Sequence, residues 1–366
     1  MERNGVVVKA VPIEAVDLFC GVGGLSLGLM RAKIRVRLGV DFDKHCRYAY
    51  ERNISGAHFS LGDIGTVEGS TLSTHYSGGA VRLLAGCAPC QPFSTLRNGT
   101  DAQSSDKWPL LNHFGRLVCE MQPDLVTMEN VPALMKNSIF KSFVDGLTKG
   151  GYHVWHQIVD AAAYGVAQRR RRLVLLASRF GAVELLPPSR LGCTAKTVQD
   201  VIGGLPPITS GEESRVDRLH KARNVSSLNM RRLRASRPGG TWEDWPAALR
   251  SPCHQRESGS SFKSVYARME WHKASPTITT QASNFGTGRF GHPEQDRAMS
   301  LREMALLQSF PIDYEFVAPD FPVQFTPVGR LIGNAVPPDL GYAIGASFVH
   351  HIKGASLHVG ARAVSI

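Results

Sequence analysis

The N-terminal half of the chain alternates between short apolar runs and longer stretches with helical spacing. The apolar runs have the length of buried strands and occupy 15–19, 36–40, 81–85, 125–128, 154–159 and 173–177. The helical patterns cover 25–32, 44–53, 111–121 and 140–149. Such alternation predicts an α/β domain whose mostly parallel sheet is covered by helices on both faces. The carboxyl ends of parallel strands meet at one edge, where open α/β sheets bind their ligands.

The pattern changes after the Pro-Pro pair that ends at Pro188. The segment 189–276 is rich in Ser, Pro, Arg and Gly and shows little sustained periodicity, which indicates a second, smaller and irregular domain. A helical pattern returns over 301–308, and the apolar C-terminal stretch looks helical enough to pack on the first domain. We therefore expect a main domain over 1–188, a smaller domain over 189–276 and a closing segment over 277–366 that completes the main domain.

Basic side chains outnumber acidic ones by 42 to 31, which gives the 366-residue chain a formal net charge of +11. The surplus is uneven, because the stretch 211–273 holds 13 Lys and Arg residues against 7 Asp and Glu residues. This distribution is compatible with a solvated basic face or with a surface that binds a polyanion, most naturally a nucleic acid. Charge alone does not separate the two interpretations.

Composition and cysteine usage indicate the class of protein and its cellular compartment. Hydrophobic residues make up 43% and charged residues 20%, which is typical of a globular protein and excludes a disordered or collagen-like chain. The seven cysteines are odd in number and scattered, which favours reduced thiols over a disulfide framework. No apolar run approaches the roughly 18 residues of a membrane span, and Lys9 and Glu14 interrupt the N-terminal apolar stretch. We expect a soluble, cytoplasmic protein without a signal peptide.

A glycine-rich turn follows the first predicted strand, in the sequence DLFCGVGG that ends at Gly24. Glycines there let the backbone approach a ligand and leave N–H groups of the next helix free. Asp41 lies 20 residues after Gly21, at the end of the next strand, where a carboxylate can accept hydrogen bonds from ribose hydroxyls. Ser26 takes the last glycine position of the dinucleotide fingerprint, which favours a nucleoside-type cofactor. A purely structural turn is the alternative.

A second candidate site is the sequence GCAPCQPFS over 86–94, which follows another predicted strand. Cys87 and Cys90 form a CxxC pair, which is compatible with redox chemistry, although the redox motif belongs to a different and smaller fold. A zinc site would need a second pair of ligands, which does not occur at the expected spacing. The third interpretation is a nucleophilic thiolate at Cys90 on a loop stiffened by prolines.

We favour the thiolate because other chemically competent residues follow neighbouring strands. Glu129 follows the strand 125–128, so its carboxyl group is placed to face the thiol at the same edge of the sheet. The arginine run 169–172 precedes the strand 173–177, where an arginine can orient the acid or bind phosphate. A surface glutamate and a solvated charge run are the alternatives.

The order of these motifs along the chain is more specific than any one of them. The series is DLFCGVGG, VDFD, GDI, PCQPFS, ENV, QRRRR and GNAVPP, over 17–24, 40–43, 62–64, 89–94, 129–131, 168–172 and 333–338. Over nearly its whole length the chain resembles the DNA (cytosine-5) methyltransferases. The sequences TITT, GHPEQDR and LRE over 277–280, 291–297 and 301–303 are similar to those of bacterial members.

The resemblance implies a Rossmann-like, S-adenosylmethionine-dependent methyltransferase domain with a smaller target-recognition domain. The implied activity is sequence-specific methylation of double-stranded DNA at carbon 5 of cytosine, as in restriction-modification systems of bacteria or phages. A monomer is the family default, and a cognate restriction endonuclease acting on the same site is an expected partner. No metal ligand set is implied.

The resemblance also implies a role for individual residues. The implied S-adenosylmethionine contacts are Phe19, Gly21, Gly23 and Gly24 at the methionine portion, Asp41 at the ribose, Phe42, Asp63, Ile64 and Leu110 at the adenine, and Asn334 and Val336 at the C-terminal side. Cys90 would add to carbon 6 of cytosine, and Glu129 would hold a proton at ring N3. Arg170 and Arg172 match the paired arginines of the family, of which Arg172 would hold the base and Glu129.

Two further segments acquire roles from the resemblance. The loop 93–107 would close over a flipped-out base, and 189–276 would read the DNA sequence. Candidate DNA contacts there are Arg231, Arg232, Arg234 and Arg237. Trp242 and Trp245 are expected to form the small core of that domain.

Three alternatives remain open at this stage. A related tRNA cytosine-5 methyltransferase shares the catalytic motifs, but its Cys-Phe-Thr element is missing from this chain. A catalytically silent homologue would bind DNA without modifying it. A CxxC oxidoreductase on a nucleotide-binding fold would use Cys87 together with Cys90.

Overall fold

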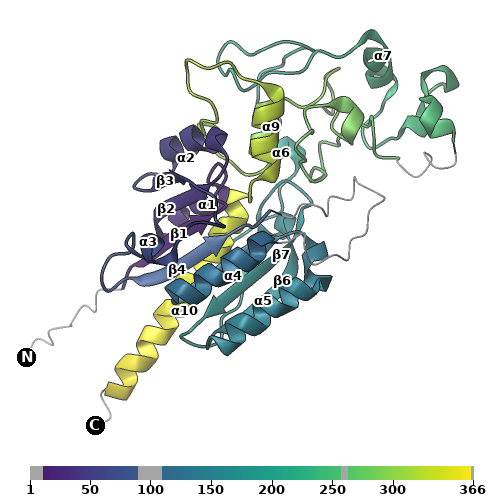
Figure 1. The fold of residues 1–366 in the computed structure, drawn as a ribbon. Coiled ribbons are helices and arrows are strands. Elements are labelled where there is room, and N and C mark those ends of the chain that lie inside the picture. Colours follow the sequence, from purple (N-terminus) through teal and green to yellow (C-terminus); the bar gives the residue numbers. More distant parts are fainter. Residues whose placement is uncertain (1–10, 90–108, 257–262, 364–366) are drawn as a thin grey trace, which may run out of the picture.

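The computed structural model describes residues 11–89, 109–256 and 263–363, with side chains as far as residue 355. A seven-stranded sheet with the order β3-β2-β1-β4-β5-β7-β6 forms its centre (Figure 1). The strands are β1 Ile13–Leu18, β2 Arg35–Asp41, β3 His58–Leu61, β4 Val81–Gly86, β5 Leu125–Asn130, β6 His153–Asp160 and β7 Arg171–Ser178. The expected α/β fold is confirmed, and each of the six predicted strands is present.

The sheet is mostly parallel, as the sequence predicted, with one reversal. Strands β1 to β5 pair in parallel, whereas β7 is antiparallel to both β5 and β6. The register places Glu129 opposite Val174 and Asn130 opposite Leu173. Because β7 runs backwards, its first residues lie at the same edge as the last residues of β1, β4 and β5.

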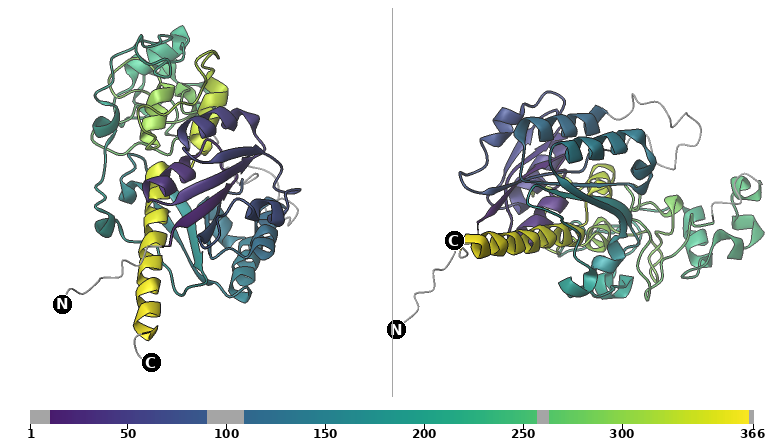
Figure 2. Two further views of the ribbon diagram at one scale, coloured as in Figure 1. Left: turned by 90° about the vertical axis from the view of Figure 1, so that its left-hand side faces the viewer. Right: turned by 90° about the horizontal axis from the view of Figure 1, so that it is seen from below.

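Helices cover both faces of the sheet (Figure 2). Side chains of adjacent residues in a strand point to opposite faces. On β4, Leu83 packs in the core beneath α1 Gly24–Arg31 and α10 Pro338–Ala363, while Leu84 packs in the core beneath α4 Pro109–Met121 and α5 Ser138–Lys149. Strand β1 is buried over its whole length. Burial on both faces explains why these strands appear in the sequence as continuous apolar runs rather than alternating ones.

Several elements were not predicted from the sequence. They include β3, α3 Gly69–Ser73, α6 Val198–Ile202, α7 Ser227–Ala235 and α9 Phe325–Asn334. The pattern over 44–53 divides into η1 Lys44–Cys46 and α2 Arg47–Asn53, and the later helix is α8 Leu301–Leu307. Other short 3₁₀ turns are η3 Pro132–Lys136, η4 Ala161–Tyr164, η5 Pro188–Leu191, η6 Trp242–Asp244, η7 Ala247–Leu249, η8 Pro252–Gln255 and η10 Phe285–Thr287. In the described part of the chain, no helix has the length and apolarity needed to cross a membrane.

A separate small core lies away from the sheet, in the green part of Figure 1 around α7. It contains Leu233, Trp242, Trp245, Phe285 and Ala298, which confirms the expectation that the two tryptophans form a small core. One of the proposed DNA contacts is wrong. Arg232 is buried, its Nε donates to the carbonyl oxygen of Leu249 at 2.9 Å, and its guanidinium lies 5.0 Å from the centre of the Tyr266 ring. Its guanidinium group is held within this core and is not available to DNA.

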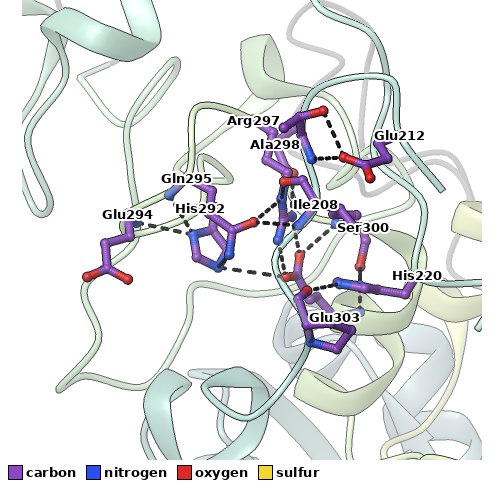
Figure 3. Close-up of polar contacts among 12 residues, drawn as sticks. Ile208, Glu212, His220, His292, Glu294, Gln295, Arg297, Ala298, Ser300 and Glu303 are labelled. Atoms are coloured by element: carbon purple, nitrogen blue, oxygen red, sulfur yellow. Dashed lines mark hydrogen bonds and ion pairs between the residues drawn. The ribbon is translucent and has the colours of Figure 1, made fainter. Parts of the chain in front are cut away.

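A buried polar network connects α8 to the loops around the small core (Figure 3). Arg297 and Glu303 form a two-pronged ion pair with N–O distances of 2.8 and 2.7 Å, and both side chains are 1% exposed. Ser300 caps α8, and its hydroxyl lies 2.8 Å from Nδ1 of His220. Burial opposes ionisation of Glu303, but the guanidinium of Arg297 outweighs it and lowers the pKa of this carboxyl to about 2. Burial lowers the pKa of His292, beside it, to about 4.

The C-terminal helix α10 packs directly on α1. The two backbones approach closely at Gly28, where an added Cβ would lie 2.4 Å from the backbone carbon of Gly341. A substitution at this point must therefore separate the two helices.

Gly28→Ala should destabilise the protein by about 1–3 kcal/mol, because overpacking a close backbone contact forces the helices apart. Gly146 on α5 is the matched control, since an added Cβ there meets no atom within 4 Å. Gly146→Ala should instead stabilise the protein by about 0.5–1 kcal/mol through helix propensity. Urea unfolding of both variants measures the difference, and equal midpoints would contradict this account of the α1–α10 contact.

Glu303→Gln should destabilise the protein by about 3–5 kcal/mol at neutral pH, because it leaves the buried Arg297 without a counter-charge. The folded-state pKa of Glu303 lies below its usual value of 4.5, so the ion pair contributes stability above pH 4.5 that is lost as the pH falls towards 2. The free energy of unfolding, measured by denaturation between pH 4.5 and pH 2, should therefore fall less steeply with decreasing pH for the variant than for the wild type. If the free energies of unfolding of the two proteins changed equally with pH, the ionised form of Glu303 would not stabilise the fold.

Candidate active site

The carboxyl ends of β1, β2, β4 and β5 open into a cavity of about 570 Å³, together with the start of β7 and the end of α9. Cavities of this size are typical of small-molecule and cofactor sites. Residues from distant parts of the sequence line it: Asp17, Phe19 to Val22, Leu25, Asp41 to Asp43, Cys46, Cys87 to Pro89, Leu110, Glu129 to Val131, Arg170, Arg172, Arg330, Leu331 and Gly333 to Val336. The carboxyl-end edge of the parallel strands, where the sequence predicted a ligand site, therefore forms a wall of the cavity.

The glycine-rich turn after β1 forms one end of the cavity. Gly21 has a φ of +53°, and its N–H donates to Oδ2 of Asp41 at 2.8 Å. The other oxygen of Asp41 accepts the N–H of Asp43 at 2.9 Å. Burial raises the pKa of Asp41, and these two hydrogen bonds counteract the shift. Each carboxylate oxygen retains a lone pair for a ligand.

The side chain at position 26 has a structural reason to be a serine. Its hydroxyl donates to Oδ2 of the fully buried Asp17 at 2.6 Å and lies 2.8 Å from the hydroxyl of Tyr50. Burial raises the pKa of Asp17 to about 7, and the hydrogen bond from Ser26 offsets part of this rise. Oδ1 of Asp17 is buried, and no described residue forms a hydrogen bond with it. Asp17 is one of the residues that line the cavity beside the turn.

The C-terminal segment closes the cavity from the other side. A Cβ added at Gly24 would lie 2.1 Å from the carbonyl oxygen of Val336, so only glycine allows the turn and this segment to touch. Arg330 on α9 forms an ion pair with Asp43 at 2.6 Å, next to the Asp41 carboxylate. Phe42 is 71% exposed and leaves an aromatic ring at the mouth of the cavity.

Glu129 lies at the opposite end, where β4, β5 and β7 meet. Its side chain is 4% exposed, and Oε1 is 3.0 Å from Nε of Arg172. Since Glu129 is opposite Val174 on the antiparallel strand β7, Arg172 is its diagonal neighbour on the same face. Oε2 accepts a hydrogen bond from Sγ of Cys87 at 2.9 Å. An acid, an arginine and a thiol therefore meet at this point.

The two predicted arginines have different surroundings. Arg172 contacts Glu129, whereas the guanidinium of Arg170 donates to the carbonyl oxygens of Ile278, Gly333 and Ala335, each at 3.2 Å. Arg170 is 3% exposed. These hydrogen bonds hold the C-terminal segment against the cavity. None of the three is made to Glu129.

The structure brings most of the predicted site residues together, but not all. Those that line the cavity are Phe19, Gly21, Asp41, Phe42, Leu110, Glu129, Arg170, Arg172, Asn334 and Val336. Gly23 and Gly24 shape the turn behind the lining. Asp63 is exposed and accepts the N–H of Gly65, while Ile64 is buried in the core beneath α4. Cys90 lies outside the described residues, and Pro89 before it is in the lining.

Sequence reasoning missed Asp17, Asp43, Cys46, Arg330 and Leu331 as lining residues. Asp43 lies two residues after Asp41 in the predicted acidic turn, so the sequence did contain a signal for it. Arg330 had none, because its contact with Asp43 joins residues that are far apart in the sequence.

Arg170→Met should lower the free energy of unfolding by about 2 kcal/mol or more, because it leaves buried carbonyl groups without a donor. The neighbouring Arg169 is exposed, so Arg169→Met should change stability by less than about 0.5 kcal/mol. Urea unfolding monitored by tryptophan fluorescence compares the two variants. If the Arg170 variant were as stable as the control, the three hydrogen bonds would not hold the C-terminal segment in place.

A sequence profile of the family described as C-5 cytosine-specific DNA methylase matches residues 13–350. The Type II methylase M.HgiDII of Herpetosiphon aurantiacus is 46% identical over 342 residues, covering 93% of this chain and 96% of that protein. The Type II methyltransferase M1.HphI of Haemophilus parahaemolyticus is 31% identical over 341 residues, covering 92% and 87%.

The fold is similar to that of solved structures. A chain described as a prophage-encoded DNA modification methyltransferase of Escherichia coli has a TM-score of 0.70 at 22% identity, covering 93% of this chain and 99% of that one. That likeness shows a shared fold. Together with the match of the family over residues 13–350, it leads to one conclusion: the chain belongs to the C-5 cytosine-specific DNA methylase family and is a DNA (cytosine-5)-methyltransferase.

Proposed function

We propose that this enzyme uses S-adenosylmethionine to methylate carbon 5 of a flipped-out cytosine within a specific DNA sequence, through a covalent adduct with Cys90. The observation that carries the proposal is that one cavity has both kinds of lining that this reaction needs. The glycine-rich turn with Asp41 and Phe42 forms one end, and the Glu129–Arg172 pair forms the other.

The residues of the first end suit S-adenosylmethionine. Asp41 offers carboxylate lone pairs to ribose hydroxyls, and the exposed ring of Phe42 offers a stacking surface for adenine. The side chain of Asn334 supplies a polar partner near the turn. When bound, S-adenosylmethionine would supply an electrophilic methyl group. Asp63 and Ile64 do not line the cavity, so their contact with adenine requires a different arrangement of the segment that carries them.

The second end suits the activation of cytosine. The thiolate of Cys90 would form a bond to carbon 6, and the displaced electron pair would make carbon 5 nucleophilic. Glu129 would hold a proton at ring N3, so that negative charge does not accumulate there, and Arg172 would fix the carboxyl group in place. After methylation, loss of the proton from carbon 5 would restore the double bond and expel the Cys90 thiolate.

The target carbon is inaccessible in a stacked duplex, so the base must leave the helix. We place recognition of the duplex in the segment 189–276, whose small core contains Trp242 and Trp245. Arg231, Arg234 and Arg237 are exposed on or beside α7 and are candidate contacts to DNA phosphates. The loop 93–107, proposed as the lid over the flipped base, lies outside the described residues.

The relatives suggest the biological setting. Two of them carry the name Type II, which denotes restriction-modification systems. We therefore propose that this chain protects the host DNA from a cognate endonuclease of the same specificity. The protein would act in the cytoplasm as a monomer on double-stranded DNA.

Bisulfite sequencing of a plasmid that carries the gene tests the proposal. The wild type should leave 5-methylcytosine within one short sequence, and Cys90→Ser should leave none. Glu129→Gln should reduce methylation in vitro by about 100-fold or more, in line with the usual contribution of a positioned acid. Cys119 is exposed on α4, far from the reacting groups, so Cys119→Ala should remain fully active. Full activity of the Cys90 variant would refute the covalent mechanism.

A further inference from the structure

Cys87 has a fixed place beside Glu129 because of the strand register. In the parallel pair β4–β5, Gly86 is opposite Met128, so the next residues of the two strands, Cys87 and Glu129, are neighbours. The Cys87 N–H donates to the carbonyl oxygen of Leu18 on β1 at 3.3 Å. The side chain of Asn130 donates to the carbonyl oxygen of Ala88 at 2.9 Å. The backbone that carries the thiol is therefore held from both neighbouring strands.

The two oxygens of the Glu129 carboxyl group have different partners. Oε1 is 3.0 Å from Nε of Arg172, and Oε2 is 2.9 Å from Sγ of Cys87. Contacts at both oxygens prevent rotation of the carboxyl plane about its last torsion angle, which is otherwise broad. The direction in which the group faces the cavity is therefore set by two strands, β7 through Arg172 and β4 through Cys87.

We propose that Cys87 is a positioning residue for methyl transfer, whose S–H donates to Glu129 Oε2 and orients this carboxyl group towards the target base. The role rests on the function proposed for Glu129. Cys87 acts through Glu129 and forms no bond to the base or to the methyl donor. The first cysteine of the CxxC pair thus has a function that requires neither a disulfide nor a metal.

The weakness of a thiol as a donor explains its use at this position. A second cation at Oε2 would favour the ionised carboxylate, whereas the proposed step needs a proton on Glu129. A thiol is a weak hydrogen-bond donor, so Cys87 orients Oε2 without binding it tightly. Oε2 can therefore exchange the Cys87 S–H for ring N3 of the base. The stronger, charged contact is confined to Oε1.

Three substitutions separate hydrogen bonding from packing. Cys87→Ser keeps an O–H donor, Cys87→Ala removes the donor, and Cys87→Val removes the donor while retaining bulk. Initial rates of methyl transfer to a duplex oligonucleotide give kcat and KM, and thermal unfolding identifies variants that fold. The Ala and Val variants should lower kcat about tenfold, the upper range for loss of one hydrogen bond between neutral groups, with KM values for DNA and S-adenosylmethionine within about twofold. The Ser variant should stay within about threefold of wild-type kcat.

The exposed Cys119→Ala variant is the control for loss of a thiol elsewhere and should match the wild type. Equal losses in the Ser and Ala variants would overturn the proposal, as would wild-type kcat in the Val variant or an effect confined to KM. These results would overturn only the role of Cys87, and the proposed methylation of cytosine would still stand. Absence of 5-methylcytosine with the wild-type enzyme would instead refute the proposed function and this inference together.

Discussion

The antiparallel pairing of β7 with β5 is the constraint on which the site depends. In a fully parallel sheet, the residues that begin a strand lie at the opposite edge from those that end its neighbour. Because β7 runs backwards, Arg172 at its start lies beside Glu129 at the end of β5. The same reversal brings Arg170 against the C-terminal segment, which it holds through three carbonyl groups. One change of strand direction thus supplies both an ion pair in the site and a wall of the cavity.

The segment that closes the cavity is also tied to the smaller, irregular part of the chain. Gln168, just before β7, is buried and contacts the side chain of Gln308 at 2.6 Å, while its oxygen accepts the N–H of Ile278 at 2.7 Å. Gln308 in turn donates to the carbonyl oxygen of Ile332. The Arg297–Glu303 network then links α8 to the loops around the small core. Cavity wall and small core are therefore both held against α8 and its C-terminal end by buried polar contacts.

The sequence predicted six of the seven strands, the edge of the sheet and the residue types at the site, because each depends on local periodicity and on motifs near strand ends. It could not predict contacts set by tertiary structure. The burial of Arg232 depends on Trp245 and Tyr266, which only folding brings beneath its guanidinium. The Arg330–Asp43 ion pair joins α9 to the loop after β2. The hydrogen bond from Cys87 to Glu129 depends on the register of β4 and β5, which a CxxC pattern does not reveal.

The central claim is that the thiol after β4, the acid of β5 and the arginine of β7 act on one extruded cytosine. Duplex DNA containing 5-fluorocytosine tests this claim directly, since the fluorine at carbon 5 cannot leave as a proton and the adduct is trapped. After incubation with S-adenosylmethionine, mass spectrometry of the DNA-linked peptide should place the covalent bond on Cys90 and leave Cys87 unmodified. A bond to Cys87, or the absence of any covalent complex with an enzyme that methylates normal DNA, would contradict the account.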